Sequence, residues 1–526
     1  MSEGNGMGGE RVAVIGAGMG GLAAALSLAA RGFRVTVLEK ADQPGGKMRA
    51  VPAGETLVDG GPTVFTMRWI LDELLAEAGF ATDEHLRLTP LGVLARHAWD
   101  GSDGVFDLAA DEQASAEAIA RFAGAAEARG FRGFAARAAA IHATLDRTFM
   151  RAARPNPLTL VGRAGLEGLA RLWGVSPFAV LWDELGKHFR DPRLRQLFGR
   201  YATYCGANPF TAPATLMLIA HVEQRGVWAV EGGMHTLART LGLLAERAGA
   251  TFRFGAEVSE ILIEGGRVAG VRLADGERIA AERVVVNADV AALSAGLFGE
   301  AARRAVPDQG RVPRSLSALT WTGLARAEGF PLTRHTVFFS RDYRDEFDRI
   351  ARGHLPNEPT VYVCAQDRGD DGSPPGGPER LLVLVNAPAR GDRGQPTREE
   401  IERCEQATFA LLARCGLKIA WEPGAVRRTG PAEWARLFPA TGGALYGRDL
   451  AGWRASFQRP GARTRLPGLY LAGGSVHPGP GVPMALMSGR LAASALMADH
   501  ASTRRCHRAA TPGGMSMRSA TTEPTA

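Results

Sequence analysis

A glycine-rich turn between two apolar runs near the start constrains this chain most. Residues 11–30 have the pattern of a buried strand, a turn with glycines at the first, third and sixth positions, and an alanine-rich helix. Residues 34–39 follow as a second apolar strand that ends in an acid. This order is typical of a dinucleotide-binding βαβ unit. The alternative, a glycine-rich helix start without a ligand, does not require the flanking strand and the acid.

Each residue of the turn has a physical role in such a unit. Gly16 permits the tight turn, Gly18 lets the backbone approach a pyrophosphate, and Gly21 allows the helix to pack closely on the strand. The helix begins near Met19, so its free N–H groups and positive dipole face the phosphates. Glu39 is expected to accept hydrogen bonds from the adenosine ribose.

Two further glycine pairs follow within residues 44–49 and 58–65. An NAD site needs neither pair, whereas they resemble the loops with which long FAD-binding enzymes hold the pyrophosphate and ribityl chain. Lys47 stands where such enzymes usually carry arginine. Its ammonium is a point charge and lacks the paired donors of a guanidinium. The cofactor-binding residues predicted here are Gly46, Lys47, Gly61, Pro62 and Thr63.

Residues 468–489 give a third cofactor element. They combine an apolar strand, a glycine loop and a helix with Pro483 in its first turn. The N-terminus of this helix is expected to stabilise negative charge on a reduced flavin. His477 in the loop is either a catalytic base or a histidine that bonds a carbonyl, and the second interpretation is favoured. The predicted contacts are the backbone N–H groups near Val482 and Met484, together with Gly474 and Ser475, which stand where an aspartate is more usual.

The middle of the chain returns to the same domain. A helix is expected from about residue 231, followed by strands at 251–254, 258–264, 268–273 and 283–287. Val258 is placed where such folds make a backbone contact to adenine. The cofactor domain is therefore predicted to be discontinuous, with residues 1–90, 226–310 and 460–500, interrupted by insertions at 91–225 and 311–459 and followed by a disordered tail at 501–526.

The first insertion begins with a predicted hairpin at residues 94–107 and continues as helix over 111–149, with interruptions near Gly130 and Gly133. Residues 155–187 are apolar with interleaved arginines, the composition of an interfacial amphipathic segment. Ordinary core helices are an equally weighted alternative for this segment.

The second insertion contains predicted strands at residues 335–339, 359–365 and 380–386. They are expected to form an antiparallel sheet that makes one wall of a substrate site. Residues 397–400 form a capping box that opens a helix carrying Cys404 and Cys415.

Composition excludes several other classes. The five cysteines show neither CxxC nor zinc spacing, so we expect a reduced, cytosol-facing protein without a metal. No signal peptide precedes the first strand, and the apolar run at residues 12–30 is explained by its glycine pattern rather than by a membrane span. The net charge of +7 suits an anionic membrane surface or follows from an arginine-rich composition. No nucleic-acid partner is expected.

Five blocks together resemble one family: residues 45–49, 59–66, 190–204, 228–235 and 471–483. They are similar to the bacterial carotenoid desaturases of the phytoene-desaturase type, over residues 11–497. Within them, the block at 190–204 is most similar to the hydroxyneurosporene and methoxyneurosporene desaturases.

The resemblance implies an α/β fold of the amine-oxidase and phytoene-desaturase superfamily. Its parts would be a Rossmann-type FAD-binding domain, an inserted antiparallel-sheet substrate domain and a helical membrane-associating region. The implied activity is desaturation of 1-hydroxy- or 1-methoxy-carotenoids at C3–C4, with hydride transfer to flavin N5. Oxygen or a quinone would accept the electrons, and the location would be cytoplasmic, peripheral to the inner or photosynthetic membrane.

The residues nominate no catalytic base. The terminal oxygen of the substrate needs a buried polar partner, for which Tyr201, Thr203, Tyr204 and His235 are candidates. Alternatives are a phytoene or neurosporene desaturase, a redox-neutral carotene isomerase, a flavin amine or protoporphyrinogen oxidase, and a non-enzymatic lipid-binding chaperone. The complete set of three glycine elements argues against the chaperone.

Overall fold

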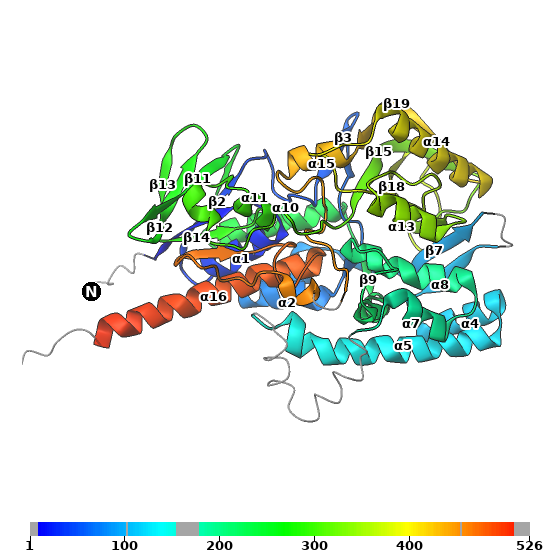
Figure 1. Ribbon diagram of the computed structural model, residues 1–526, viewed down its shortest axis with the longest axis horizontal. Coiled ribbons are helices and arrows are strands. Elements are labelled where there is room, and N and C mark those ends of the chain that lie inside the picture. Colours follow the sequence, from blue (N-terminus) through cyan, green and yellow to red (C-terminus); the bar gives the residue numbers. More distant parts are fainter. Residues whose placement is uncertain (1–8, 101–103, 154–177, 453–454, 510–526) are drawn as a thin grey trace, which may run out of the picture.

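A five-stranded parallel sheet forms one end of the molecule (Figure 1). The computed structural model describes residues 9–100, 104–153, 178–452 and 455–509. The strand order of this sheet is β10-β2-β1-β14-β20, and every pairing in it is parallel. Its strands come from three distant parts of the chain: β1 (Arg11–Ile15), β2 (Arg34–Glu39), β10 (Thr251–Phe254), β14 (Arg283–Val286) and β20 (Leu469–Leu471).

Helices α1 (Met19–Ala29), α10 (Met234–Arg247) and α16 (Val482–Ala509) share one apolar core with this sheet. Helix α1 is apolar on all sides because it packs against both other helices. A Cβ on Gly489 of α16 would lie 2.2 Å from the carbonyl oxygen of Gly20, so glycine permits the close crossing of α16 and α1.

Helix α16 also corrects the predicted tail. The chain stays helical to Ala509, whereas disorder was expected from residue 501. The packed part of the helix provides a nucleus from which it propagates at little cost. Residues 510–526 lie outside the described residues.

The chain also forms smaller sheets and short helices. Strands β11, β12 and β13 form an antiparallel sheet that packs with the short helices α11 and α12. The predicted boundaries of β10 and β11 are confirmed. The smaller elements are β3 (Ala50–Ala53), β4 (Thr56–Asp59), β5 (Phe65–Thr66), α2 (Arg68–Glu77), α3 (Thr82–His85), β6 (Leu88–Pro90), β9 (Val227–Val230), β11 (Val258–Glu264), β12 (Arg267–Leu273), β13 (Arg278–Ala280), α11 (Val290–Ser294) and α12 (Glu300–Arg303).

A seven-stranded sheet with the order β19-β15-β18-β17-β16-β7-β8 forms the other end. Its strands pair antiparallel except β16 with β7, which are parallel. The predicted hairpin is confirmed as β7 and β8, but it extends this sheet rather than the helical insertion, because β7 is buried against β16. The strands are β7 (Val93–Trp99), β8 (Phe106–Ala109), β15 (Ser317–Glu328), β16 (His335–Phe339), β17 (Val361–Ala365), β18 (Glu379–Ala387) and β19 (Lys418–Thr429).

Helices cover this second sheet, and the longest of those described on the first insertion is α5.

The predicted interruption near Gly130 and Gly133 is wrong, because α5 runs through both and the break lies at Gly124, where φ is +98°. Gly130 instead makes room for a neighbour, since a Cβ there would lie 2.0 Å from the carbonyl oxygen of His188. These helices are α4 (Glu112–Ala123), α5 (Ala125–Leu145), η1 (Asp146–Met150), α7 (Leu181–His188), α8 (Pro192–Gly199), η2 (Arg200–Cys205), η3 (Ala214–Met217), α9 (Leu218–Gln224), α13 (Tyr343–Ala351), α14 (Arg398–Arg414), α15 (Pro431–Leu437) and η4 (Ala455–Gln458).

Local capping agrees with the sequence. The Oγ1 atom of Thr397 accepts a hydrogen bond from the backbone N–H of Glu400 at 3.2 Å, so the predicted start of α14 is confirmed. Most of the amphipathic segment predicted at 155–187 lies outside the described residues. In the described part of the chain, no helix combines the length and the apolar character needed to cross a bilayer.

Candidate functional site

One cavity of about 760 Å³ lies between the glycine loops of the parallel sheet and the face of the seven-stranded sheet. Strands β15 to β18 and the short helix η2 line its apolar part. Of the predicted cofactor residues, thirteen line this cavity: Gly16, Gly18, Met19, Glu39, Gly46, Lys47, Gly61, Pro62, Thr63, Val258, Gly474, Ser475 and Val482.

Two predicted residues do not line the cavity. A Cβ on Gly21 would lie 2.1 Å from the carbonyl oxygen of Gly16, so Gly21 serves the helix–strand packing expected of it. The side chain of Met484 is partly buried against the apolar core that α1, α10 and α16 share. The contact predicted for Met484 is a backbone N–H at the start of α16, and this side-chain packing leaves that prediction open.

The acid at the end of β2 is buried, and backbone N–H groups hold its carboxylate in position. Glu39 accepts hydrogen bonds from the N–H of Ala17 at 2.6 Å and of Ala41 at 2.9 Å. Helix α1 begins at Met19 without a side-chain cap, so the N–H groups of its first turn lack intrahelical acceptors. Both features suit the ribose and phosphates of a dinucleotide.

Asn287, directly after β14, joins two glycine loops and was not predicted. Its side-chain amide donates to the carbonyl of Ala472 at 3.1 Å. A Cβ on Gly18 would lie 2.7 Å from Oδ1 of Asn287, and one on Gly473 would lie 2.6 Å from its Nδ2. The available sequence signal for this role is a polar residue that directly follows the three valines of β14.

Two cations lie beside the loops. Nζ of Lys47 donates to the carbonyl of Leu445 at 2.6 Å and lies 5.3 Å from the centre of the Phe438 ring. Burial lowers the pKa of Lys47. Arg459, which was not predicted, donates to the carbonyls of Gly474 and Tyr446, both at 3.0 Å, and burial lowers its pKa to about 10. Arg459 thereby fixes the third loop.

Asp59 ties the second loop to helix α10. Its carboxylate accepts from the N–H of Met234 at 2.6 Å and of His235 at 3.0 Å. The ring of His235 lies 2.9 Å from the carbonyl oxygen of Pro44 and does not line the cavity. His235 is therefore wrong as a candidate for the substrate oxygen, because its position on α10 points it at a loop carbonyl.

The other three candidates belong to a polar cluster around η2. The hydroxyls of Tyr201 and Tyr204 both donate to the buried carboxylate of Glu223. Nη1 of Arg200 donates to the hydroxyl of Tyr204 at 3.2 Å, and Thr203 donates to the carbonyl of Arg200 at 2.8 Å. Arg200, Thr203 and Tyr204 line the cavity, whereas Tyr201 lies behind it.

Tyr362 on β17 connects this apolar part to the cofactor loops. Its hydroxyl lies 2.7 Å from Oγ1 of Thr63 and 2.7 Å from Nδ1 of His335. Burial, together with the charges of Arg334 and Arg200, lowers the pKa of His335 to about 3. His335 is therefore neutral at physiological pH.

His477 is buried, with Nε2 3.0 Å from the carbonyl oxygen of Phe149. Burial lowers its pKa to about 4. The favoured interpretation of a carbonyl-bonding loop histidine is confirmed by this geometry.

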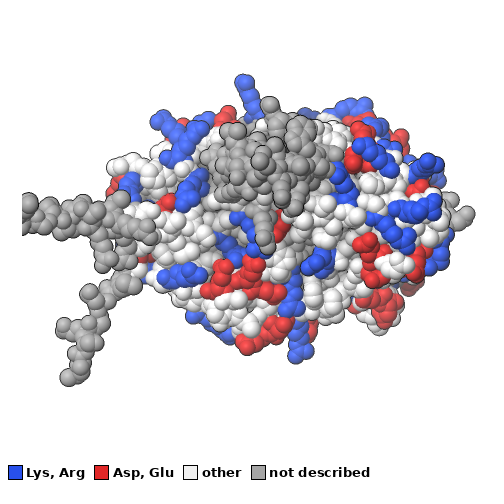
Figure 2. All heavy atoms as spheres, turned by 90° about the horizontal axis from the view of Figure 1, so that it is seen from below, with Lys and Arg blue, Asp and Glu red and all other residues white. Residues whose placement is uncertain are grey.

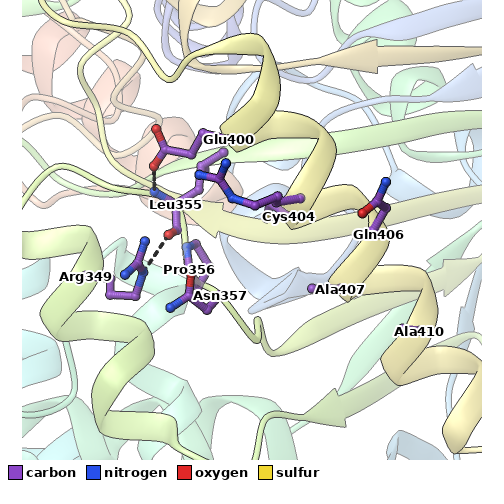
Figure 3. Close-up of a pocket in the computed structure, with 10 residues that line it drawn as sticks. Arg349, Leu355, Pro356, Asn357, Glu400, Cys404, Gln406, Ala407 and Ala410 are labelled. Carbon is purple, nitrogen blue, oxygen red and sulfur yellow. Dashed lines mark hydrogen bonds between the residues drawn. The ribbon is translucent and has the colours of Figure 1, made fainter.

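A second, smaller hollow of about 370 Å³ lies between α13 and α14 (Figure 3). There the backbone of Leu355 donates to Glu400 at 2.7 Å and accepts from Arg349 at 3.0 Å. These charged groups hold a surface loop, and the hollow is separate from the glycine loops. We therefore place the functional site in the larger cavity.

The fold and this cavity define a flavin-dependent oxidoreductase, and the chain belongs to the flavin containing amine oxidoreductase family, which matches residues 19–497. It is 56% identical over 514 residues to a hydroxyneurosporene desaturase of Rubrivivax gelatinosus, with 98% of each chain covered. It is 49% identical over 498 residues to a hydroxyneurosporene desaturase of Cereibacter sphaeroides, covering 94% of this chain and 99% of that one.

Among solved structures, an oxidoreductase from Methanosarcina mazei shares the fold, with a TM-score of 0.58 at 16% identity, over 93% of this chain and all of that one. The cofactor is FAD. The cradle fits it, because backbone rather than side chains lines the cavity at Gly18, Gly46, Gly61 and Gly474.

Proposed function

We propose that this flavoprotein desaturates an acyclic carotenoid carrying a hydroxyl or methoxyl group at C1, forming a double bond between C3 and C4. The observation that carries the proposal is the continuity of one cavity from the glycine loops to apolar side chains such as Val337, Leu382 and Leu384. An apolar lining suits a polyene. The relatives at 56% and 49% identity, both named hydroxyneurosporene desaturase, support this substrate class.

Within this proposal, the cofactor lies along the glycine loops. The adenosine would lie against Glu39 and Val258, and the pyrophosphate against the first turn of α1. The ring end would lie near Lys47, Thr63 and Ser475. Bound FAD supplies the hydride acceptor.

The reaction needs little charged chemistry from the protein. Two neighbouring C–H bonds would break, and a carbon–carbon π bond would form. One hydrogen would pass as hydride to the bound FAD and the other as a proton to the reduced cofactor. The side chains of the sheet would hold the C3–C4 bond against the flavin and exclude water. The two electrons would then pass to oxygen or a quinone.

Peripheral attachment to a membrane is part of the proposal, because a carotenoid dissolves in lipid. The support comes from the substrate rather than from charge. On the face shown in Figure 2, basic and acidic side chains are intermingled around the described surface. We therefore expect attachment to depend more on apolar contact than on anionic lipid.

The proposal is tested by mixing the oxidised holoenzyme, without oxygen, with a 1-hydroxylated carotenoid in lipid vesicles. We expect the yellow flavin absorbance to bleach and one product with one more double bond to form. Bleaching by phytoene or neurosporene instead would indicate an earlier desaturase. Conversion without net bleaching would indicate an isomerase, and bleaching only by an amine would indicate an amine oxidase.

A further inference from the structure

Three buried side chains near the apolar part of the cavity carry polar atoms without a hydrogen-bond partner among the described residues. These atoms are Nε and Nη2 of Arg200, the hydroxyl of Tyr343 and Nε2 of His97. The residues are 7%, 5% and 0% exposed, respectively. Buried polar groups are nearly always paired, so a cluster of unpaired ones indicates a partner from outside the chain. Arg200 and Tyr343 line the cavity, whereas His97 lies behind it.

Arg200 and Tyr343 contribute to the same part of the cavity wall. Burial raises the pKa of Tyr343, and the nearby positive charge of Arg200 opposes this rise. Burial also lowers the pKa of His97, and the charge of Arg200 lowers it further. The ring of Tyr343 packs edge-on against Phe339 and Phe347, with centroids 6.1 and 5.1 Å away. Aromatic side chains therefore hold the ring of Tyr343 in place at this apolar end.

The charge of Arg200 is already compensated. Nη1 donates to Tyr204, and Tyr204 and Tyr201 both donate to Glu223, so a buried carboxylate balances the guanidinium through two phenols. An anionic ligand would leave an uncompensated negative charge in this apolar end. Arginine has donors only, so the ligand atom must be an acceptor. A neutral oxygen satisfies both conditions.

We propose that Arg200 and Tyr343 form the subsite that binds the oxygen atom on C1 of the carotenoid. This inference deepens the proposed function and rests on it. The oxygen is three bonds from C3, so the subsite must lie close to the reacting bond. Tyr204, which holds Arg200, lies near enough to influence the pKa of Tyr362, and Tyr362 bonds Thr63 on the cofactor loop.

The subsite therefore discriminates between carotenoids with and without an oxygen on C1. Both a hydroxyl and a methoxyl oxygen can accept from Arg200, and Tyr343 can donate to either. A hydrocarbon end would leave Nε and Nη2 of Arg200 without an acceptor, which is the condition under which a polar site rejects an analogue strongly. Binding the oxygen also fixes the C3–C4 bond in position.

The test compares kcat/KM for 1-hydroxy-1,2-dihydroneurosporene and for 1,2-dihydroneurosporene, which has the same skeleton without the oxygen. The holoenzymes are wild type, Arg200→Met, Arg200→Lys and Tyr343→Phe, each with its flavin content measured. Tyr470→Phe is the matched control, because Tyr470 bonds Asp499 at 2.9 Å outside the cavity. We expect Arg200→Met to lower kcat/KM for the hydroxylated substrate about 100-fold and Tyr343→Phe about 10-fold, with less change for the hydrocarbon.

Arg200→Lys should retain part of the preference, since it keeps a donor, and Tyr470→Phe should retain all of it. If Arg200→Met does not bind flavin, Tyr343→Phe and Arg200→Lys provide the test. The quantity compared is the ratio of kcat/KM for the hydroxylated substrate to kcat/KM for the hydrocarbon. Flavin-loaded variants that keep the wild-type ratio would overturn the subsite while leaving the proposed function intact. A wild type that desaturates neither substrate would overturn both.

Discussion

The hydroxyl groups of Thr63 and Tyr362 lie 2.7 Å apart and join the second cofactor loop to the seven-stranded sheet. A second tie lies nearby, where the side-chain amide of Gln366 pairs with the backbone of Asp59 at 3.1 and 2.9 Å. Both ties connect residues about 300 positions apart in the chain. They fix the apolar wall of the cavity relative to the cofactor loops.

Removing the Thr63 hydroxyl should loosen this junction. Thr63→Val keeps the volume but removes the bond between the Tyr362 hydroxyl and the cofactor loop, while the contact of Tyr362 with His335 remains. We expect a turnover rate about tenfold lower and an unfolding free energy about 1 kcal/mol lower, with flavin retained. Thr63→Ser, which keeps the hydroxyl, is the control. Equal rates for the two variants would show that the bond is dispensable.

Gly18→Val should abolish flavin binding. A Cβ there would lie 2.7 Å from Oδ1 of Asn287, and the side chain would occupy the backbone's approach to the pyrophosphate. Gly377→Val is a suitable control, because its Cβ would have no atom within 4 Å. The measurement is flavin absorbance per protein after purification. A Gly18→Val protein that stays yellow would refute the assignment of this loop.

Glu39→Gln should weaken FAD affinity about 10- to 100-fold. The carboxylate accepts from two backbone N–H groups, and an amide would present a donor to one of them. Titration of the apoprotein with FAD, followed by flavin fluorescence, measures the change. Glu55→Gln on an exposed turn serves as the control. Unchanged affinity in Glu39→Gln would remove this acid from the cofactor site.

Acid should destabilise the protein through His335. Its pKa is about 3 in the folded protein, below the ordinary value of 6.5. Between these values the unfolded chain binds a proton that the folded chain does not, so stability falls as pH falls from about 6.5 to about 3. His477, with a pKa of about 4, acts in the same direction.

His335→Asn keeps a polar atom near Tyr362 but cannot titrate. We expect its unfolding free energy to lose on the order of 3 kcal/mol less than wild type across this pH range. Denaturant unfolding at several pH values measures the difference. Parallel curves for the two proteins would contradict a neutral, buried His335.

Local patterns predicted several elements in both halves of the molecule. The strands β10 and β11, the hairpin β7–β8 and the cap of α14 depend on residues close in sequence, and all were predicted. The helix break predicted near Gly130 was wrong. A glycine can mark either a break or a close contact, and only the position of His188 in the fold distinguishes the two.

The substrate site was harder to predict. His235 and Arg200 are both polar residues among apolar neighbours. The sequence cannot show that the ring of His235 meets the carbonyl of Pro44 while the side chain of Arg200 lines the cavity. A single arginine between Leu197, Phe198 and Tyr201 was the available signal for Arg200. The role of Arg200 becomes apparent only when the fold brings Glu223 and Tyr343, which are distant in sequence, close to it.

The most direct test of C3–C4 desaturation is to express the protein in bacteria that make neurosporene, with and without its 1-hydroxylated derivative, and to record absorption spectra of the extracted pigments. We expect a red shift corresponding to one extra conjugated double bond, only where the hydroxylated carotenoid is present. A shift with neurosporene alone, or no shift with flavin-loaded protein, would contradict it.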